Sequence, residues 1–371
     1  MKHNASCQTI FLSIITLLVL SGCSSFGSRN IPRDRFDYNE AIAQSHNQQM
    51  LLNIVRFRYL EIPNFLAVSS VITSYAYDGS VGLSGTSNAT PSNEIITGNA
   101  NLGYAEKPTI TYAPLAGQEF AIRLLKNISV EGIFSLGHAG FPMDILMAIG
   151  LHRINDVKNM GFGGVPAPGE VDIDKQFMKE SQDLTNFGHV LNLLLTLEEK
   201  GVLEARRIKN GEKEYTQLHF STDISPAMRK LVTELKATLN LDPNLNAFRV
   251  TSRTTGRDKD EITIQSRSLL AMMGFLGRGV MVPPEDEEAK KVVVFPESAK
   301  KNILAHAPLK IYSQKEVPVD PFVAIKYRDY WFYIDRTDTR SKRTFGTMLV
   351  LFQLQAPSQG TQAPLLTLPA G

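Results

Sequence analysis

Two long stretches of this chain alternate apolar and polar residues with a period of two, from Val71 to Gly85 and from Ile96 to Tyr112. Successive side chains of a β-strand point to opposite faces, so this alternation predicts two strands that each have one apolar and one polar face. The polar link over residues 86–93 predicts that the strands form a hairpin with arms of about fifteen residues. Strands of globular proteins typically have only about five or six residues, so the predicted hairpin is unusually long.

Helical patterns flank this hairpin on both sides. Asp37 and Glu40 form a capping box that predicts a helix to about Tyr59, and Pro63 ends that element. After Pro114, short apolar helices separated by glycines are predicted over residues 118–126, 130–136 and 142–149.

Short helices and strands alternate in the second half of the chain. The glycine- and proline-rich segment 161–169 predicts a loop and a domain boundary. Hairpins are predicted over 202–220, with Asn210-Gly211 as the turn, and over 248–265, around Gly256. Further helices are predicted over residues 174–200, 226–239, 266–280 and 339–355. Short strands are predicted over residues 292–295, 309–312, 322–327 and 330–334. The pattern predicts an α+β fold in which antiparallel hairpins alternate with short helices.

The composition is that of an ordinary globular protein, since 43% of the 371 residues are hydrophobic and 20% are charged. The net charge of +2 favours no polyanionic partner, so we expect no nucleic-acid binding. Both cysteines, Cys7 and Cys23, lie near the N-terminus, so the rest of the chain has no thiol for a disulfide or for catalysis.

The N-terminal segment has the pattern of a signal peptide. Residues 10–20 are mostly apolar and follow the basic Lys2, and this run has the length of a signal-peptide core, too short for a comfortable membrane span. The next residues, Leu20-Ser21-Gly22-Cys23, resemble a lipobox, the signature of bacterial lipoproteins. The resemblance implies that signal peptidase II recognises Leu20, Ser21 and Gly22 and removes residues 1–22. It also implies that Cys23 then carries acyl chains such as palmitate, and several chains anchor a protein stably to a membrane.

The residue after the cysteine bears on localisation. Ser24 stands there instead of Asp, which resembles the outer-membrane sorting pattern of Gram-negative lipoproteins. The resemblance implies attachment to the inner leaflet of the outer membrane, facing the periplasm. The rest of the chain resembles uncharacterised envelope lipoproteins, which imply no activity. We expect an acylated tether over 23–36, regions at 37–160 and 170–355, and a disordered tail over 356–371.

Motifs for catalysis are mostly missing from the sequence. There is no Gly-x-Ser-x-Gly elbow, no His-Glu-x-x-His and no phosphate-binding loop, and the histidines lack metal-ligand spacing. Ser298-Ala299-Lys300-Lys301 matches the Ser-x-x-Lys pattern, but a chance match is expected in a chain with this much serine and lysine. We therefore expect no catalytic residue, no metal and no cofactor. A periplasmic hydrolase stays open as an alternative without a supporting motif.

Residues 327–343 form a first candidate contact surface, because they combine the only tryptophan with tyrosines, aspartates and cations. The candidate residues are Trp331, Tyr333, Asp335, Arg336, Asp338, Arg340 and Arg343. Cations in the first turn of a helix oppose its dipole, so they need nearby carboxylates, an anion or a partner. Two interpretations stay open: a capped helix with local ion pairs, or a surface that binds an unknown envelope protein.

The long hairpin is the second candidate. Its apolar face, with Tyr75, Tyr77, Leu102 and Tyr104, resembles strands of outer-membrane β-barrels. A lone hairpin cannot close a barrel, but several copies together can, as in some oligomeric outer-membrane secretion pores. The other interpretation is an amphipathic sheet packed on the protein's own helices, and Lys107-Pro108 is expected to interrupt the second arm. The leading expectation is a non-enzymatic, lipid-anchored component that binds partners, with a homo-oligomeric pore subunit as the alternative.

Overall fold

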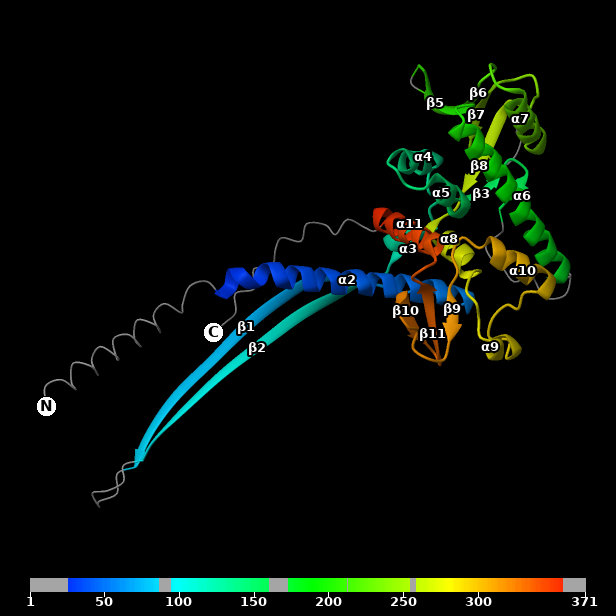
Figure 1. Ribbon diagram of the computed structural model, residues 1–371. Helices are drawn as coiled ribbons and strands as arrows, with labels where there is room; N and C mark the ends of the chain where they lie inside the picture. Colours follow the sequence, from blue (N-terminus) through cyan, green and yellow to red (C-terminus); the bar gives the residue numbers. More distant parts are fainter. Residues whose placement is uncertain (1–25, 87–94, 160–172, 212, 254–257, 356–371) are drawn as a thin grey trace.

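The computed structural model describes residues 26–86, 95–159, 173–211, 213–253 and 258–355. Helices and mostly antiparallel strands both contribute, so the predicted α+β class is confirmed. In Figure 1 a six-stranded sheet and a three-stranded sheet lie at opposite ends of the body, with helices between them. The long hairpin extends away from this body.

Helix α2, Phe26–Arg58, has 33 residues and begins well before the capping box at Asp37. Residues 26–36 of the predicted tether are therefore helical, and their role as the link to an acylated Cys23 stays a prediction. A capping box favours a helix start, but it does not prevent the preceding residues from being helical. Pro32 is the seventh residue of α2 and so lies inside the helix, where proline has no N–H to donate to the Ser28 carbonyl four residues earlier. The C-terminal part of α2 is anchored in the core through Met50, Leu51, Ile54 and Val55.

Strands β1, Phe65–Thr86, and β2, Ile95–Leu115, pair antiparallel as a sheet of their own. The predicted hairpin is confirmed, and its arms of 22 and 21 residues are longer than the alternation indicated. Lys107 and Pro108 pair with Ser74 and Thr73 in register, so the predicted interruption is wrong. Proline is tolerated in an edge strand because it only removes a donor, and both strands of this sheet are edges.

The body has one hydrophobic core that runs from Met50 to Leu351. Helix α2 packs against α8 and strand β10, which belong to the second half of the chain. The body also contains further helices: α3 (Gln118–Leu125), α4 (Val130–His138), α5 (Met143–Gly150), α8 (Leu269–Gly277) and α11 (Thr339–Gln355).

A six-stranded sheet joins the two regions that the sequence analysis separated. Its strands are β3 (Leu151–Ile154), β4 (Val157–Lys158), β5 (Leu203–Asn210), β6 (Lys213–Phe220), β7 (Ala247–Thr251) and β8 (Glu261–Ser266), in the order β4-β3-β8-β7-β6-β5. Helices α6 (Ile173–Glu199) and α7 (Pro226–Thr238) pack together beside it. Because β3 pairs with β8, the predicted division at 160–170 does not separate two cores.

Strands β7 and β8 correct one predicted hairpin. Both strands form, but they pair in parallel, with Arg249 opposite Glu261 and Thr251 opposite Thr263. Arg249 forms an ion pair with the fully buried Glu261, and this ion pair stabilises the parallel register. Alternation predicts a strand but says nothing of its direction, so the hairpin over 248–265 is wrong.

The three-stranded sheet contains β9 (Tyr312–Gln314), β10 (Pro321–Tyr327) and β11 (Tyr330–Asp335), in the order β10-β11-β9. The predicted strands at 322–327 and 330–334 are confirmed. Residues 292–295 do not form a strand; they bury Val292 and Phe295 in an extended segment between α9 (Pro284–Glu288) and α10 (Glu297–His306).

Candidate functional site

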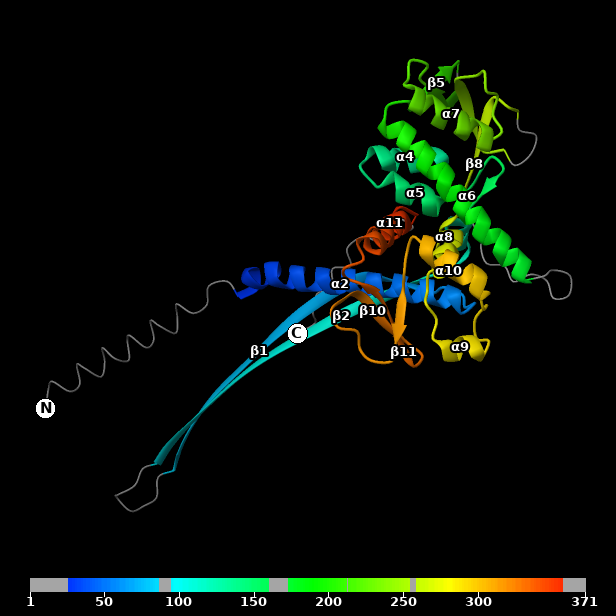
Figure 2. The same ribbon diagram turned by 45° about the vertical axis from the view of Figure 1, so that its right-hand side comes forward.

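The β1–β2 hairpin is the feature that sets this molecule apart. Figure 1 and Figure 2 show it as a narrow two-stranded ribbon that leaves the body and continues beyond it. With 22 residues at roughly 3.3 Å each, β1 is about 70 Å long. In both views the N-terminal end of α2 points to the same side as the far end of the hairpin. Beyond its base the ribbon leaves the body, so the interpretation in which the whole sheet packs on the protein's own helices is wrong.

The hairpin carries apolar side chains that face solvent. Leu66, Ile72, Ile110 and Tyr112 are each more than 40% exposed. Of the candidate membrane residues, Tyr77 and Tyr104 are opposite one another in the register, Leu102 is opposite Gly79 and Tyr75 is opposite Glu106. At these four candidates the structure describes the backbone pairing but not the side chains.

The base of the hairpin is firmly attached to the body. Phe65 is buried and packs against Phe120 and Phe352, with ring centroids 6.0 and 4.5 Å away. Asn53 of α2 donates to the Asn64 carbonyl at 2.7 Å and accepts from the Asn64 amide at 2.9 Å. These contacts hold the start of β1 against α2, so the direction of the hairpin is set by the core.

An apolar cavity of about 580 Å³ lies beside this base. Phe120, Leu124, Phe177 and Leu270 contribute to its wall, together with Arg58 and Arg278. Its exposed rim carries three large apolar side chains, since Leu60 and Leu125 are each 60% exposed and Ile62 is 87% exposed.

Both arginines of the cavity are buried, with 6% of Arg58 and 5% of Arg278 exposed. Arg58 donates to the Val293 carbonyl at 2.7 Å and lies over the Phe295 ring at 4.3 Å. Burial lowers the pKa of Arg58 to about 10, so the guanidinium stays charged at neutral pH. Arg278 forms an ion pair with Glu180 at 2.7 Å.

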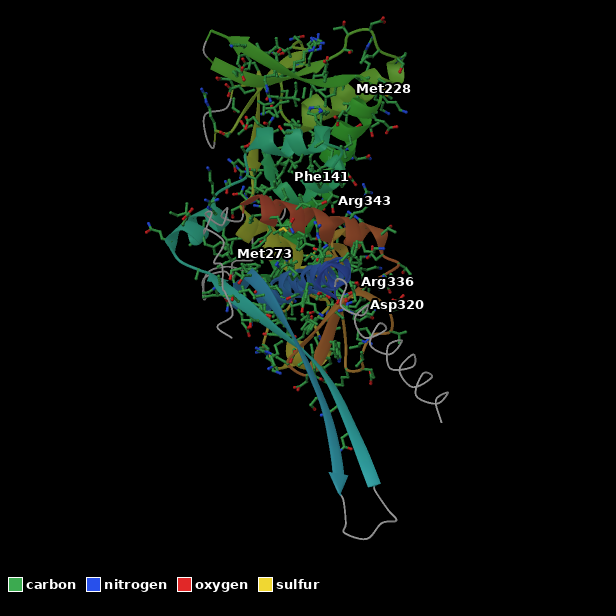
Figure 3. All side chains as sticks on the ribbon, turned by 90° about the vertical axis from the view of Figure 1, so that its left-hand side faces the viewer. Phe141, Met228, Met273, Asp320, Arg336 and Arg343 are labelled. Carbon is green, nitrogen blue, oxygen red and sulfur yellow. The ribbon has the colours of Figure 1, made fainter. Side chains whose placement is uncertain are left out.

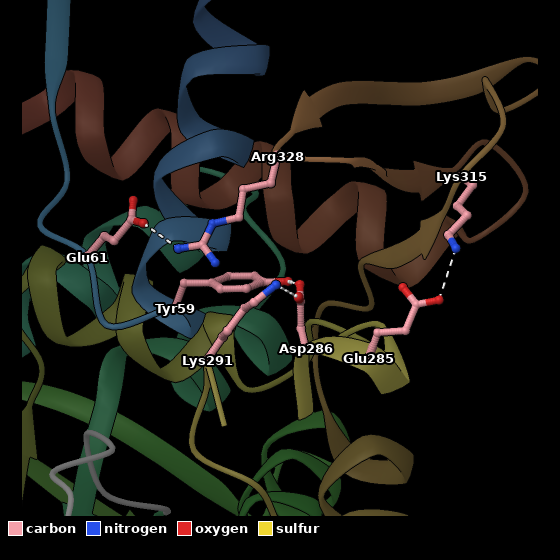
Figure 4. A network of polar contacts seen from close by, with 7 residues as sticks. All are labelled: Tyr59, Glu61, Glu285, Asp286, Lys291, Lys315 and Arg328. Atoms are coloured by element: carbon pink, nitrogen blue, oxygen red, sulfur yellow. Dashed lines mark hydrogen bonds and ion pairs between the residues drawn. The ribbon is translucent and has the colours of Figure 1, made fainter. Parts of the chain in front are cut away.

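A polar network joins the end of α2 to two distant segments (Figure 4). The Tyr59 hydroxyl donates to Asp286 at 2.6 Å, and Lys291 donates to the same carboxylate at 2.6 Å. Arg328, in the β10–β11 turn, lies 4.8 Å over the Tyr59 ring and donates to Glu61 at 3.1 Å. Burial raises the pKa of Tyr59 above its ordinary value, so its hydroxyl remains a donor.

Glu61 is held from a second side by the same turn. The Tyr327 hydroxyl donates to it at 2.5 Å, and this bond lowers the pKa of Glu61. Burial and the bond to Glu61 raise the pKa of Tyr327 to about 12. These hydrogen bonds and ring contacts therefore hold the end of α2 and Glu61, at the rim of the cavity, against α9 and the β10–β11 turn.

The candidate surface at 327–343 is largely occupied by contacts within the chain. Figure 3 shows Arg336 beside Asp320, and these two side chains form an ion pair at 2.7 Å. Asp338 caps α11 by accepting from the Ser341 amide at 3.0 Å, and Arg343 lies 4.0 Å from Asp144. These contacts are those of a capped helix with local ion pairs.

The remaining candidates of that surface divide between packing and exposure. Asp335 accepts from the Thr337 amide at 2.7 Å, and Tyr333 packs 5.7 Å from Tyr312. Trp331 is half-buried against the cross-strand neighbour Lys326, and Arg340 is exposed. The structure brings the seven residues together, but it does not present them as one open surface.

Leu20, Ser21, Gly22 and Cys23 lie outside the described residues, as does the predicted tail, so lipid attachment remains a prediction. Within the described ranges no group of three or more His, Cys, Asp or Glu side chains is placed to hold a metal ion. None of the described helices is long and apolar enough to cross a membrane. Comparisons with protein-family models, curated proteins and solved structures find no match to this chain.

Proposed function

We propose that this chain is a lipid-anchored, non-enzymatic structural component of the bacterial outer membrane that assembles through the β1–β2 hairpin. The observation that carries the proposal is the isolation of the hairpin from its own body. A two-stranded hairpin is marginally stable in water on its own, and exposed strand edges are templates for pairing with other chains. A hairpin of this length is therefore expected to have a partner for its edges.

The geometry favours identical hairpins as that partner. Each hairpin offers one free edge on β1 and one on β2, so copies can pair edge to edge around a ring. A strand needs about ten residues to cross a bilayer, and both arms have about twice that length. In lipid every backbone group must be paired, which a closed ring of hairpins provides and a single hairpin does not.

The predicted anchor supports the same orientation. Cys23 precedes α2 by three residues, and the N-terminal end of α2 points to the side of the hairpin tip. An acylated Cys23 and an inserted hairpin can therefore meet one membrane. The surface at 327–343 supports a partner-binding role less well, because most of its charged groups are engaged within the chain. The described residues give the alternative of a periplasmic hydrolase no additional support.

The assembly is tested by the mass of the detergent-extracted full chain. We expect native mass spectrometry and negative-stain electron microscopy to show rings for the wild type and monomers for Leu102→Asp with Tyr104→Asp. Val319→Asp is the matched control, because Val319 is 96% exposed and lies outside the hairpin. A monomeric wild type, or hairpin variants that keep the wild-type mass, contradict the proposal.

Membrane insertion is tested separately with isolated outer membranes. Cys23→Ala removes the predicted acylation site, and membranes are then washed with high salt and carbonate and treated with protease. We expect the variant to stay embedded and a fragment covering Val71 to Tyr112 to be protected. A fully soluble Cys23→Ala form means that the lipid is the sole attachment and that the hairpin is not in the membrane.

A further inference from the structure

The buried guanidinium of Arg58 has no carboxylate within ion-pair distance among the described residues. Its partners are the Val293 carbonyl and the Phe295 ring, and its Nε has no hydrogen-bond partner. Glu287 acts on it from a distance but is already paired with Lys300 at 2.7 Å. A buried charge without a counter-ion is costly, and an anionic group supplied from outside relieves that cost.

The other charged groups of the cavity are already matched. Arg278 is paired with Glu180, although its Nε has no partner, and Glu61 is held by Tyr327 and Arg328. The cavity wall therefore keeps an excess positive charge at Arg58. A guanidinium presents its N–H groups in a planar fork that fits a carboxylate or a phosphate.

The rest of the cavity suits a hydrocarbon chain. Its volume of about 580 Å³ falls within the range of ligand sites, and aromatic and aliphatic side chains such as Phe120, Phe177 and Leu270 line it. A small hydrophilic ligand does not match such a wall, because its polar groups would lose water without gaining partners.

The rim adds a route for an apolar ligand. Leu60, Ile62 and Leu125 expose most of their surface at the edge of the cavity. Leu60 lies two residues after the end of α2 and has φ +60°. The bonds from Glu61 N to Arg56 O and from Leu60 N to Phe57 O form a Schellman cap around it. Glycine is the usual residue at this position, so the leucine costs stability while it keeps an exposed apolar side chain at the rim.

We infer that this cavity binds an anionic amphiphile, with a single acyl chain against the apolar wall and a carboxylate or phosphate head group on Arg58. The ligand is a separate molecule rather than the chain's own predicted anchor. Helix α2 has 33 residues and is therefore about 50 Å long; Arg58 is its last residue, whereas Cys23 comes before its first residue in the sequence. The inference does not depend on assembly through the hairpin.

The binding test uses the full chain with Cys23→Ala, so that no covalent acyl chain enters the assay. Palmitate and lysophosphatidic acid distinguish the two head groups, hexadecanol is the uncharged chain and inorganic phosphate is the head group alone. We expect calorimetry or fluorescence displacement to show binding of palmitate or lysophosphatidic acid at least about tenfold tighter than hexadecanol. Phosphate alone should bind weakly.

Two variants separate the head group from the chain. Arg58→Met should weaken the anionic ligand about tenfold or more and leave hexadecanol within about twofold, because methionine keeps the apolar stem. Replacing a buried charge by an apolar residue usually keeps the fold. Both Ala121 and Ala139 are exposed, but only Ala121 lines the cavity, so Ala121→Trp should obstruct it and weaken both ligands, whereas Ala139→Trp should change neither.

Three results with the amphiphiles would overturn the inference. These are no binding of either anionic amphiphile, equal binding of palmitate and hexadecanol, or an unchanged anionic affinity in Arg58→Met. Binding of inorganic phosphate as tight as lysophosphatidic acid would also overturn it, because the acyl chain would then contribute nothing.

Discussion

Tyr59 offers the sharpest test of how the end of α2 is held. Its ring packs against Tyr327 and Phe332 with centroids 5.2 and 6.1 Å away, and its hydroxyl donates to the buried carboxylate of Asp286 at 2.6 Å. Tyr59→Phe keeps the ring and removes only the donor. A hydrogen bond to a charged group contributes about 1.5–3 kcal/mol, and Lys291 still holds Asp286 in the variant. We expect the free energy of unfolding to fall by about 2 kcal/mol.

The assay is equilibrium urea unfolding of the purified chain at pH 7. Tyr333→Phe is the matched control, because the Tyr333 ring packs on Tyr312 and its hydroxyl makes no hydrogen bond to the residues that the structure describes. The control should change stability by less than about 0.5 kcal/mol. Equal stability of Tyr59→Phe and wild type would refute the reasoning that this bond ties α2 to the α9 segment.

The pH dependence of the same variant has a definite sign. Burial by itself raises the pKa of Asp286, but the hydrogen bonds from Lys291 and Tyr59 outweigh it and hold this pKa below its ordinary value. A carboxyl group with a lowered folded-state pKa stabilises the protein above pH of about 4, and this contribution is lost as pH falls through the folded value. The difference between wild type and Tyr59→Phe should therefore narrow below pH of about 4. A constant difference contradicts this account.

Two further substitutions test single backbone positions in urea. Asn155→Ala should lower the free energy of unfolding by about 3 kcal/mol. The Asn155 side chain accepts from the buried Thr263 amide at 2.7 Å and donates to the Leu239 carbonyl at 2.7 Å, and its backbone has φ +49°, which alanine adopts less readily. A loss below about 1 kcal/mol contradicts this expectation. Leu60→Gly should leave stability unchanged or raise it by up to about 1 kcal/mol, since it removes left-handed strain, while palmitate binding weakens. A clear loss of stability contradicts that interpretation of Leu60.

Much of the secondary structure follows from local patterns in the sequence. The closing helix α11 spans the predicted residues 339–355, and α7 begins where Ser225 caps it and Pro226 occupies its first turn. The turn at Asn210-Gly211 joins β5 and β6 as predicted, with Gly211 at φ +63°. Capping, turn chemistry and side-chain periodicity act over a few residues, so one sequence is enough to read them.

Candidate sites were less predictable than elements. The sequence distinguishes residues 327–343 by their aromatic, acidic and basic side chains, yet tertiary contacts pair Arg336 with Asp320 and bring Arg343 near Asp144. In the sequence Arg58 is only one of the cations near the end of the first predicted helix. Its importance arises from Val293 and Phe295, more than 200 positions later in the chain, which bury it.

The sequence by itself determined where most helices and strands of this protein form, and its period-two alternation determined that one hairpin is exceptionally long. Only the tertiary structure decided that β7 and β8 run parallel, that α2 begins at Phe26, and that the hairpin leaves the body. The physical reason is that alternation specifies which face of a strand is apolar, whereas the group that covers this face is chosen by contacts between distant parts of the chain. Beyond the base at Phe65, β1 and β2 form a sheet of their own, and their outer strand edges remain available to other chains.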